Sequence, residues 1–463
     1  MSEEGLRRAT EKMAAADVAE DAIAAFANFY RQIEEGASGL IAEADIAPLT
    51  ELDALADLDV DDAQLRAAAD VTAVIKLNGG LGTSMGMDRA KSLLPVKGDL
   101  RFLDIIIRQT LQARRRFGAR LPLIFMNSFR TREDVRAVLA QYPELPVGEL
   151  PADFLQNREP KLLADTLEPV DWPAQPDLEW CPPGHGDLYP ALRSTGLLAQ
   201  LIDSGFRYAF CSNADNLGAT IEPRIPAWMA AHDIPFLMES CRRTPADRKG
   251  GHLAIRRSDG RLILRETAQT SEADMQALAD LDRHRYCNTN NVWLDLGRLQ
   301  QTLDAAGGVL DLPVIRNVKT VDPADPDTPE VIQIESAMGA AVQCFAGAKS
   351  LLVERSRFVP VKTTNDLLVL RSDAYDLAAD YTLRVAPGRE VGRDPFVDLD
   401  PRFFKYLADF DRRFPDGPVS LVECDRFVVE GDVSFGAGVI ARGDVQISSN
   451  GGSRRVEPGT VLT

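Results

Sequence analysis

The sequence predicts an α/β protein built on a mixed, largely parallel β-sheet, with helices before the sheet and a left-handed β-helix at the C-terminal end. Short apolar runs without helical spacing alternate with helical patterns along most of the chain, as a largely parallel sheet requires. One of these runs, residues 71–77, stops abruptly at a glycine-rich loop. Near the C-terminus, apolar residues recur every six positions, which is typical of a β-solenoid. We therefore divide the chain into an N-terminal helical segment (1–66), an α/β domain (67–385), a connector (386–417) and a β-solenoid (418–463).

Composition narrows the class of protein. The chain has 463 residues, of which 45% are apolar and 26% are charged, so it is long enough and apolar enough for two or three soluble domains. Its net charge of -18 argues against binding to nucleic acid or to an anionic membrane, because both need a basic surface. Its six cysteines are scattered without a Cys-x-x-Cys pair, and its first residues include no apolar leader. We therefore expect a cytoplasmic protein with free thiols.

The N-terminal segment has a helical pattern. Apolar residues such as Ala22 and Phe26 lie at helical spacing within residues 8–36, so we expect one amphipathic helix there. A Gly-Ala-Ser-Gly break at 36–39 precedes an acidic stretch, for which we predict a second helix that ends near Leu65. The expected role of both helices is to brace the core.

The apolar run 71–77 predicts a buried strand, and it leads into a loop with four glycines. Glycine lets backbone N–H groups approach a ligand closely, and several such groups in a row bind anions, so the loop suits a chain of phosphates. Lys91 follows an alanine rather than the glycine of a Walker A loop, and the last glycine comes one residue too late for a dinucleotide fingerprint. We interpret Lys91 as a counter-charge to phosphate; a glycine-rich turn without a ligand is the alternative. The loop glycines are Gly79, Gly80, Gly82 and Gly86.

Further apolar runs extend the predicted sheet. Several are separated by helical patterns, which favours parallel pairing. The segment Ser258-Asp259-Gly260 lies between two such runs and indicates an inserted β-hairpin. The strands predicted after the loop are residues 121–126, 206–212, 234–241, 252–257, 262–267, 288–296 and 350–353.

The C-terminal part of the chain has a different pattern. The connector is rich in Pro, Asp, Arg and Phe, and we expect one short helix in it around residues 403–410. Beyond it, Phe427, Val433, Val439 and Val445 fall every six residues, with Gly-Asp pairs between them. This spacing predicts a parallel β-solenoid, and a two-sheet β-tail is the alternative. A short solenoid would offer its flat end and faces as contacts for a homo-oligomer.

Three polar segments beyond the glycine loop carry residue types that suit phosphate chemistry. An apolar strand ends near Asn213 and Asp215, where a carboxylate can hold Mg²⁺, although a turn-forming cluster would have the same composition. His185 lies between two glycines beside an aspartate, which favours a donor to phosphate or sugar over a structural histidine. Lys362 follows an apolar segment that turns abruptly polar, and taken alone it would be a surface charge.

Together these segments resemble one known family. The stretch Lys76-Leu-Asn-Gly-Gly-Leu-Gly-Thr-Ser-Met-Gly86, followed by Lys91-Ser92, closely resembles the nucleotide loop of the eukaryote-like UDP-glucose pyrophosphorylases, the UTP:glucose-1-phosphate uridylyltransferases. Related pyrophosphorylases begin this loop with Ala-Gly-Gly and carry Arg-Leu-Gly in place of Ser-Met-Gly. The segments around His185 and Lys362 are similar to the same family, so the likeness covers roughly residues 70–375.

The resemblance implies a glycosyltransferase-A-like, nucleotide-binding sheet, with residues 67–385 as the nucleotidyltransferase catalytic domain. This chain departs from the family in having Met87-Asp88-Arg89-Ala90 where Cys-x-Gly-Pro is usual, and in the neighbours of Gln156. The roles implied are catalysis by Lys91 and Lys362; nucleotide binding by Leu77, Asn78, Gly79, Gly80, Gly82, Thr83, Gln156 and Gly184; sugar binding by His185, Asn213, Gly251, Asn290 and Glu335; and Mg²⁺ binding by Asp215.

The resemblance also implies a reaction. We expect Mg²⁺-dependent formation of UDP-glucose and pyrophosphate from UTP and α-D-glucose 1-phosphate, by in-line attack of the sugar phosphate on the α-phosphorus of UTP. Two alternatives stay open. One is a pyrophosphorylase with another or a broader choice of sugar 1-phosphate, and the other is a non-catalytic nucleotide-sugar sensor that uses the solenoid to bind a partner.

Overall fold

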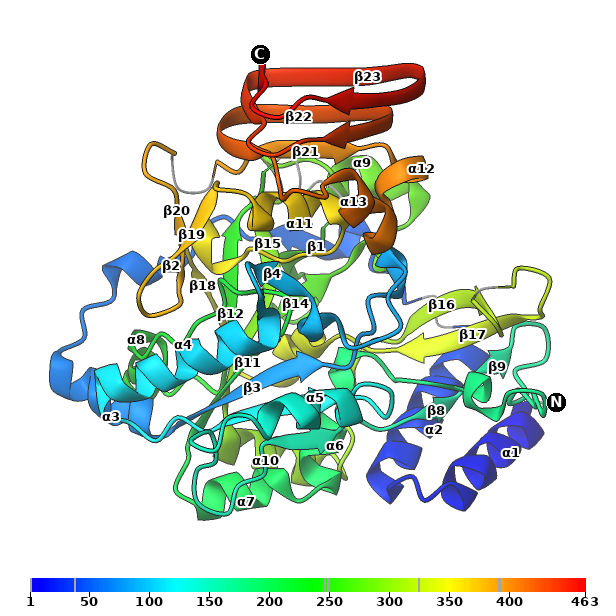
Figure 1. The fold of residues 1–463 in the computed structure, drawn as a ribbon. Helices are drawn as coiled ribbons and strands as arrows, with labels where there is room; N and C mark the ends of the chain where they lie inside the picture. Colours follow the sequence, from blue (N-terminus) through cyan, green and yellow to red (C-terminus); the bar gives the residue numbers. More distant parts are fainter. Residues whose placement is uncertain (1, 37–38, 245–246, 248–249, 324, 390–392) are drawn as a thin grey trace.

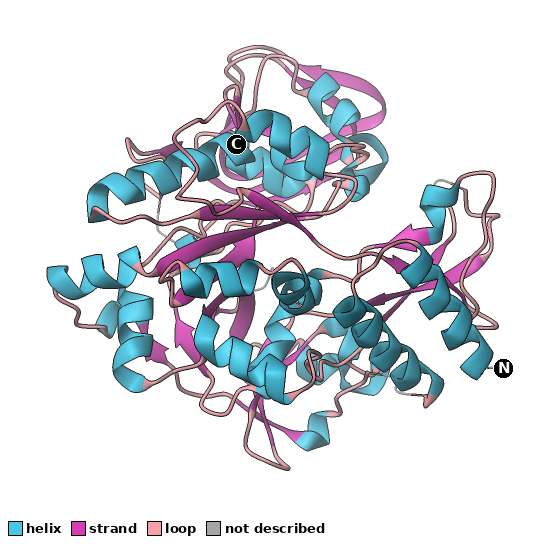
Figure 2. Ribbon diagram, turned by 90° about the horizontal axis from the view of Figure 1, so that it is seen from below, coloured by secondary structure: helices cyan, strands magenta, loops and turns pink. Residues whose placement is uncertain are grey.

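The structure is a computed structural model, and it describes residues 2–36, 39–244, 247, 250–323, 325–389 and 393–463. One large sheet runs through the centre, with helices on both of its faces and a layer of long C-terminal strands stacked at one end (Figures 1 and 2). The strands of the large sheet are β1 (Ile46–Pro48), β2 (Asp53–Ala54), β3 (Thr72–Asn78), β6 (Leu123–Asn127), β7 (Asp153–Leu155), β11 (Tyr208–Asn213), β12 (Phe236–Arg242), β13 (His252–Arg256), β14 (Leu262–Arg265), β15 (Tyr286–Asp295) and β18 (Lys349–Leu352).

The prediction of a mixed, largely parallel sheet is confirmed. The strand order is β2-β18-β12-β15-β11-β3-β6-β7, and along this path only β15 pairs antiparallel with its two neighbours. The predicted hairpin is β13 and β14, which pair antiparallel and join the sheet beside β15. Because the neighbours of β3 run parallel to it, the carboxyl ends of β3, β6 and β11 lie at one edge of the sheet.

Helices cover both faces of the sheet, which explains why the central strands are apolar without alternation. All seven residues of β3 are buried. Val74 packs into one large apolar cluster with helix α4, whereas its neighbours Ala73 and Ile75 pack into a second cluster with α6, α7 and α10. The helices are α1 (Ser2–Ala15), α2 (Glu20–Glu34), α3 (Asp62–Asp70), α4 (Phe102–Phe117), α5 (Arg132–Leu139), α6 (Leu188–Ser194), α7 (Leu197–Asp203), α8 (Arg224–His232), α9 (Met275–Leu278), α10 (Leu296–Ala305), α11 (Thr364–Arg371), α12 (Pro401–Phe404) and α13 (Leu407–Arg413).

The N-terminal segment differs from its prediction in two ways. Two helices, α1 and α2, replace the single helix, because the chain turns between them with Asp17 in the left-handed region at φ 56°. The acidic stretch that follows is not a helix: it contributes β1 and β2, which use backbone edges of the large sheet. Apart from two 3₁₀ turns, the helix described there is α3, which begins at a capping box between Asp61 and Gln64. Residues 37 and 38 of the predicted break lie outside the described residues.

Glu43 ties this N-terminal stretch to the β13–β14 hairpin. Its carboxylate contacts the guanidinium groups of Arg265 and Arg283 and the Nε2 atom of His284. The ring of His284 stacks on that of His252, with 3.8 Å between the ring centroids. Burial, with the nearby His284 and the two arginines Arg243 and Arg265, lowers the pKa of His252 to about 3. His252 is therefore neutral in the folded protein at neutral pH.

This stack predicts an acid-sensitive fold. At a pH between the folded and the unfolded pKa of His252, this ring is neutral in the folded protein and protonated in the unfolded chain. The stability of the fold should therefore be lost as the pH falls below about 6.5. Each pH unit in that window should lower the free energy of unfolding by about 1.4 kcal/mol. Urea midpoints measured across the window should fall less steeply for His252→Phe, which keeps the ring, than for the native protein. His232→Phe is the control, and equal slopes in both variants would contradict the assignment.

The C-terminal strands form a separate four-stranded parallel sheet. The predicted periodic residues Phe427, Val433, Val439 and Val445 are all buried. Phe427 lies beside Val445 in the register between neighbouring strands, which is three six-residue steps further along the chain. The connector contains α12 and α13, where one short helix was expected. The strands of this sheet are β21 (Phe396–Leu399), β22 (Ser420–Phe435), β23 (Ile440–Val456) and β24 (Val461–Leu462).

Within the part of the chain that the structure describes, four small sheets complete the fold, and the sequence pattern did not predict them. Two of them, β8 with β10 and the set β9, β16 and β17, extend from the large sheet toward α1 and α2 (Figure 1). Within the described ranges, no helix combines the length and apolarity that crossing a bilayer requires. The strands are β4 (Pro95–Lys97), β5 (Leu100–Arg101), β8 (Glu159–Pro160), β9 (Leu162–Leu163), β10 (Trp180–Cys181), β16 (Ile315–Thr320), β17 (Glu330–Glu335), β19 (Tyr375–Leu377) and β20 (Leu383–Val385).

Candidate active site

The glycine loop follows β3 directly, and polar side chains hold its start in place through hydrogen bonds. The hydroxyl of Thr131 donates to the carbonyl of Asn78, and that of Ser128 donates to the carbonyl of Gly79, both at 2.9 Å. The amide of Asn78 donates in turn to Asn127 at the end of β6. The main-chain groups from Leu77 to Gly79 are therefore fixed where three parallel strands end.

Two features of the loop require glycine. Gly82 and Gly86 have φ values of 70° and 72°, and residue Thr83 begins the single 3₁₀ turn between them. At Gly79 a Cβ atom would lie 2.8 Å from the Nε2 atom of Gln156, so the predicted uracil reader packs directly against the loop. At Gly86 a Cβ atom would lie 2.8 Å from the ring of Tyr406, in the connector.

Lys91 and Asp215 meet beside this loop. The backbone N–H of Lys91 donates to the carbonyl of Gly80 at 3.1 Å, so the chain at Lys91 lies against the glycine loop. Its ammonium lies 2.7 Å from Oδ2 of Asp215, just after β11. The other oxygen of Asp215, Oδ1, is buried and has no hydrogen-bond partner among the described residues. Asn213, at the last position of β11, is half-buried at the same edge.

The segment that carries Lys362 is attached to the same turn. The backbone N–H of Val361 donates to the carbonyl of Asp215 at 3.1 Å, and that of Val359 donates to the side chain of Asn216 at 2.9 Å. Two segments far apart in the sequence thus run together: Lys91 contacts the side chain of Asp215, and the segment that carries Lys362 is hydrogen-bonded to the backbone of the same turn.

His185 faces this pair of segments. Its Nδ1 atom accepts the backbone N–H of Met338 at 2.9 Å, so in the neutral ring the proton is on Nε2, which can donate to a ligand. Burial, and then the charge of Lys362, lowers the pKa of His185 to about 4. The ring is therefore a neutral donor at neutral pH. Beside it, a Cβ atom on Gly184 would lie 2.8 Å from the carbonyl of Ser336, so a larger residue does not fit there.

Gly251, one of the predicted sugar residues, lies against a carboxylate that the sequence pattern did not reveal. A Cβ atom on Gly251 would lie 2.3 Å from Glu266, whose pKa burial raises while Lys362 and Asn288 oppose the change. Asn290, at φ 56°, exchanges hydrogen bonds of 2.8 Å with Asn288. Glu335 ends β17, and its Cβ would lie 3.1 Å from a Cβ atom on Gly184. Residues 245, 246, 248 and 249, which precede Gly251, lie outside the described residues.

A buried ion pair, which the sequence pattern did not predict either, supports the site. Glu239, in the middle of β12, is fully buried and binds Arg357 at 2.5 and 2.7 Å. Trp293 donates its indole N–H to the same carboxylate at 2.8 Å. The carbonyl of Arg357 accepts the amide of Asn216 at 3.1 Å, so the ion pair holds the start of the Lys362 segment against the turn that carries Asp215.

Breaking this ion pair should destabilise the protein strongly. Arg357→Met removes the cation and leaves Glu239 charged and buried, a change that typically costs about 3–5 kcal/mol. The midpoint of urea unfolding should fall accordingly. Arg402→Met, which removes an exposed ion pair with Asp400, is the matched control and should change stability little. A native midpoint for Arg357→Met would show that the pair does not support the fold.

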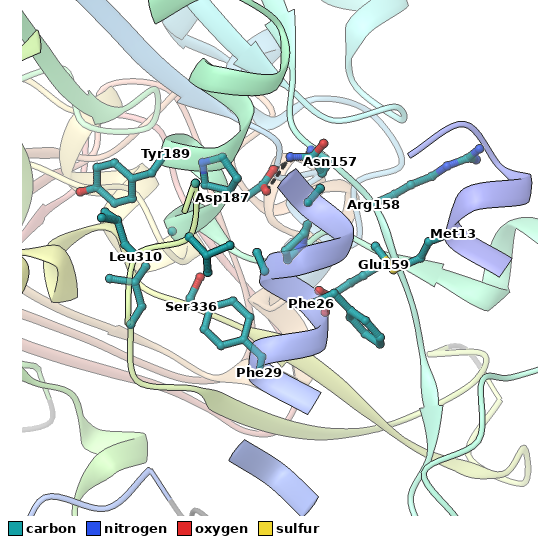
Figure 3. Close-up of a pocket in the computed structure, with 18 residues that line it drawn as sticks. Met13, Phe26, Phe29, Asn157, Arg158, Glu159, Asp187, Tyr189, Leu310 and Ser336 are labelled. Carbon is teal, nitrogen blue, oxygen red and sulfur yellow. Dashed lines mark hydrogen bonds between the residues drawn. The ribbon is translucent and has the colours of Figure 1, made fainter. Parts of the chain in front are cut away.

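A small cavity lies behind the turn at 184–187, between α2 and the substrate side of the sheet (Figure 3). It has room for about 20 Å³, and Phe26 and Phe29 line its apolar side, so it is too small for a nucleotide or a sugar. On its polar side Asp187 accepts the backbone N–H and the amide of Asn157 at 2.6 and 2.8 Å. Burial raises the pKa of Asp187 to about 7. Asp187, in the wall of the cavity, thus fixes the position of Asn157, the residue next to Gln156.

Comparison with known sequences identifies the family. The family model for UTP–glucose-1-phosphate uridylyltransferase matches residues 23–442. An enzyme of that name from Hordeum vulgare is 35% identical over 466 residues, which cover 99% of this chain and 95% of the relative. A second, from Dictyostelium discoideum, is 37% identical and covers 82% of this chain and 74% of the relative.

Comparison with solved structures agrees. A mutant UDP-glucose pyrophosphorylase from Leishmania major, in complex with UDP-glucose, superposes with a TM-score of 0.93 at 43% identity, over 99% of this chain and 98% of that one. A structure from Trypanosoma brucei, described as a UDP-glucose phosphorylase, gives a TM-score of 0.92 at 40% identity with the same coverage. The chain therefore belongs to the UTP–glucose-1-phosphate uridylyltransferase family.

Proposed function

We infer that this protein catalyses the reversible formation of UDP-glucose and pyrophosphate from UTP and α-D-glucose 1-phosphate. Family membership over most of the chain supports the activity, and so does the likeness to a structure in complex with UDP-glucose. The observation that carries the proposal is that Lys91 and the segment carrying Lys362 both attach to the Asp215 turn, next to the glycine loop. Two cations beside a row of backbone donors suit the meeting of two anionic substrates.

The residues at the site suggest how the substrates are held. The loop from Leu77 to Thr83 would bind the phosphates of UTP, with Gln156 and Gly184 against the uracil. The Nε2–H of His185 would donate to glucose 1-phosphate, and the sugar hydroxyls would meet Asn213, Gly251, Asn290 and Glu335. Attack of the sugar phosphate on the α-phosphorus needs no covalent enzyme intermediate. Catalysis is then positioning of the two substrates together with stabilisation of charge by the lysines.

Asp215 fits the role proposed for it in holding Mg²⁺. Its Oδ1 atom is buried without a partner among the described residues, and carboxylate oxygen is a ligand that Mg²⁺ prefers. No group of three or more metal-ligating side chains occurs in the described part of the chain, so one carboxylate with phosphate oxygens and waters is the expected ligand set. A bound Mg²⁺ would neutralise charge on the phosphates. The salt bridge to Lys91 keeps Asp215 near the loop.

For the C-terminal sheet we propose a short left-handed β-helix that provides a contact between copies of the chain. The parallel pairing of β21 to β24 and the burial of all four periodic residues support this arrangement. The exposed edge of the last strand, β24, is the expected contact, because an unpaired strand edge can pair with another chain.

The described cysteines are all free thiols, which favours a reducing compartment and supports the expected cytoplasmic location.

One assay tests the proposed activity. Purified protein with UTP and Mg²⁺ should release pyrophosphate with glucose 1-phosphate, and much more slowly with galactose 1-phosphate or N-acetylglucosamine 1-phosphate. Equal rates with all three sugars would replace the proposal with a broader pyrophosphorylase. No pyrophosphate with any sugar or nucleotide would leave only binding of a nucleotide sugar.

A further inference from the structure

Two buried cysteines face each other next to the sugar side of the site. Cys241 on β12 and Cys287 on β15 are direct partners in the antiparallel register, and their Sγ atoms are 3.1 Å apart. Their residues are only 1% and 2% exposed. Both are free thiols in the structure. Neither residue has a role in the proposed reaction.

The position of the pair permits a disulfide. Direct partners in an antiparallel ladder have Cα atoms about 4.5–5.5 Å apart, which lies inside the range of about 4.4–6.8 Å that disulfides span. Since an S–S bond is about 2.05 Å long, the two sulfurs need to approach by about 1 Å. The pair is one step from the end of the ladder, which closes with Arg242 and Tyr286. Strand ends open locally more often than strand centres, so a small oxidant can reach the sulfurs.

The surroundings make the two sulfurs unequal. Nη1 of Arg355 lies 3.6 Å from the Sγ of Cys241 and 4.0 Å from that of Cys287. A hydrogen bond from Cys287, and then the charge of Arg355, lowers the pKa of Cys241 against the effect of burial. The pKa of Cys287 is raised, because it shares its proton with the neighbouring sulfur and is buried. Cys241 is therefore the more acidic thiol of the two, so it is the one expected to react first with an oxidant, and Cys287 is the thiol that resolves it.

The pair is connected to the sugar residues on two sides. Arg355 also binds the carboxylate of Asp247, at 2.8 and 3.1 Å, and the carbonyl of Asp247 accepts the N–H of Gly250, the neighbour of Gly251. Arg355 lies at the start of the segment that ends at Lys362. On the other side, Cys287 immediately precedes Asn288, which is hydrogen-bonded to Asn290. A change at the sulfurs thus reaches both the proposed sugar residues and the segment that carries Lys362.

We propose that Cys241 and Cys287 are a peroxide-sensitive thiol pair whose disulfide weakens the binding of glucose 1-phosphate; the consequence for binding rests on the proposed function. The Cys241 thiolate attacks hydrogen peroxide, giving a sulfenic acid and hydroxide. The Cys287 sulfur then attacks that sulfenic sulfur, the S–S bond forms, and water leaves. In total two thiols are oxidised to one disulfide, and one peroxide is reduced to two waters. The disulfide carries no charge, so the guanidinium of Arg355 loses its attraction to the sulfur. The new bond also draws the adjoining ends of β12 and β15 together.

The first measurement does not depend on activity. After treatment of the full chain with hydrogen peroxide, mass spectrometry should find one peptide pair linked through Cys241 and Cys287, which dithiothreitol releases. The KM for glucose 1-phosphate should rise roughly 2- to 30-fold, the range expected for coupling through a contact network, while the KM for UTP changes less. Reduction should restore the original value.

Variants separate this pair from the other thiols. Cys287→Ser should abolish both the cross-link and the rise in KM, and Cys241→Ser should do the same if the first variant folds poorly. Cys344→Ser, at a partly exposed cysteine, should keep both responses. A native peptide map after oxidation would overturn the proposal, and so would an equal rise in KM in Cys287→Ser. If the cross-link forms in a protein without pyrophosphate release, the thiol pair stands and the proposed function fails.

Discussion

Replacing Lys91 with alanine should lower turnover by about 10²–10³-fold while the protein remains folded. Removing one preorganised charge that stabilises a transition state typically costs this much. The ammonium of Lys91 pairs with Asp215 at the mouth of the glycine loop and is partly exposed, so the core does not depend on it. The loss should therefore appear mainly in kcat, because the loop glycines and Gln156, which we propose bind UTP, are unchanged.

Release of pyrophosphate measures this loss, and urea unfolding confirms the fold. Lys349→Ala is the matched control, since Lys349 is an exposed lysine that contacts Asp53 at the edge of the sheet. It should leave kcat unchanged. Turnover near the native rate in Lys91→Ala would remove this lysine from the mechanism.

Replacing Asp215 with alanine should abolish the dependence of turnover on Mg²⁺ and lower the rate by a similar factor of about 10²–10³. The variant loses the carboxylate that pairs with Lys91, including the buried Oδ1 atom that has no partner among the described residues. The backbone of the turn should persist, because the carbonyl of residue 215 still accepts the N–H of Val361.

Titration of turnover with Mg²⁺ tests this prediction, and a direct reading comes from paramagnetic relaxation of water with Mn²⁺ as the probe. Asp233→Ala, at an exposed aspartate beyond α8, should behave like the native protein in both measurements. An unchanged Mg²⁺ titration in Asp215→Ala would reject the metal assignment.

The strands of the large sheet could be predicted because helices cover both of its faces. Each central strand is then a short apolar run, and the polar residues that follow it mark the functional edge. Asn78 and Asn213 are such residues, and they end the parallel strands β3 and β11, in which Asn213 lies beside Leu77. The glycine spacing of the loop was equally informative, since Gly82 and Gly86 have positive φ values that other residues rarely adopt.

Other features depend on contacts between distant parts of the chain, which local pattern does not encode. The stretch after residue 39 is acidic, yet β1 and β2 pair with edges of the sheet supplied by β13 and β18. Glu266 looks like any surface glutamate until the fold places it against Gly251. Lys91 and Asp215 follow two different strands of the sheet. The sequence indicated each residue as functional but did not show that they contact each other.

Tyr406 gives the C-terminal region a part in shaping the nucleotide loop. Its ring lies over Gly86, and its neighbours Phe404 and Phe410 belong to the same apolar cluster as β3 and α4. A shortened protein that ends before the connector would lack the Tyr406 ring over Gly86. It would also expose the apolar residues against which the connector packs. The connector helices α12 and α13 are thus part of the core, and engineers who trim the enzyme should keep the chain through α13.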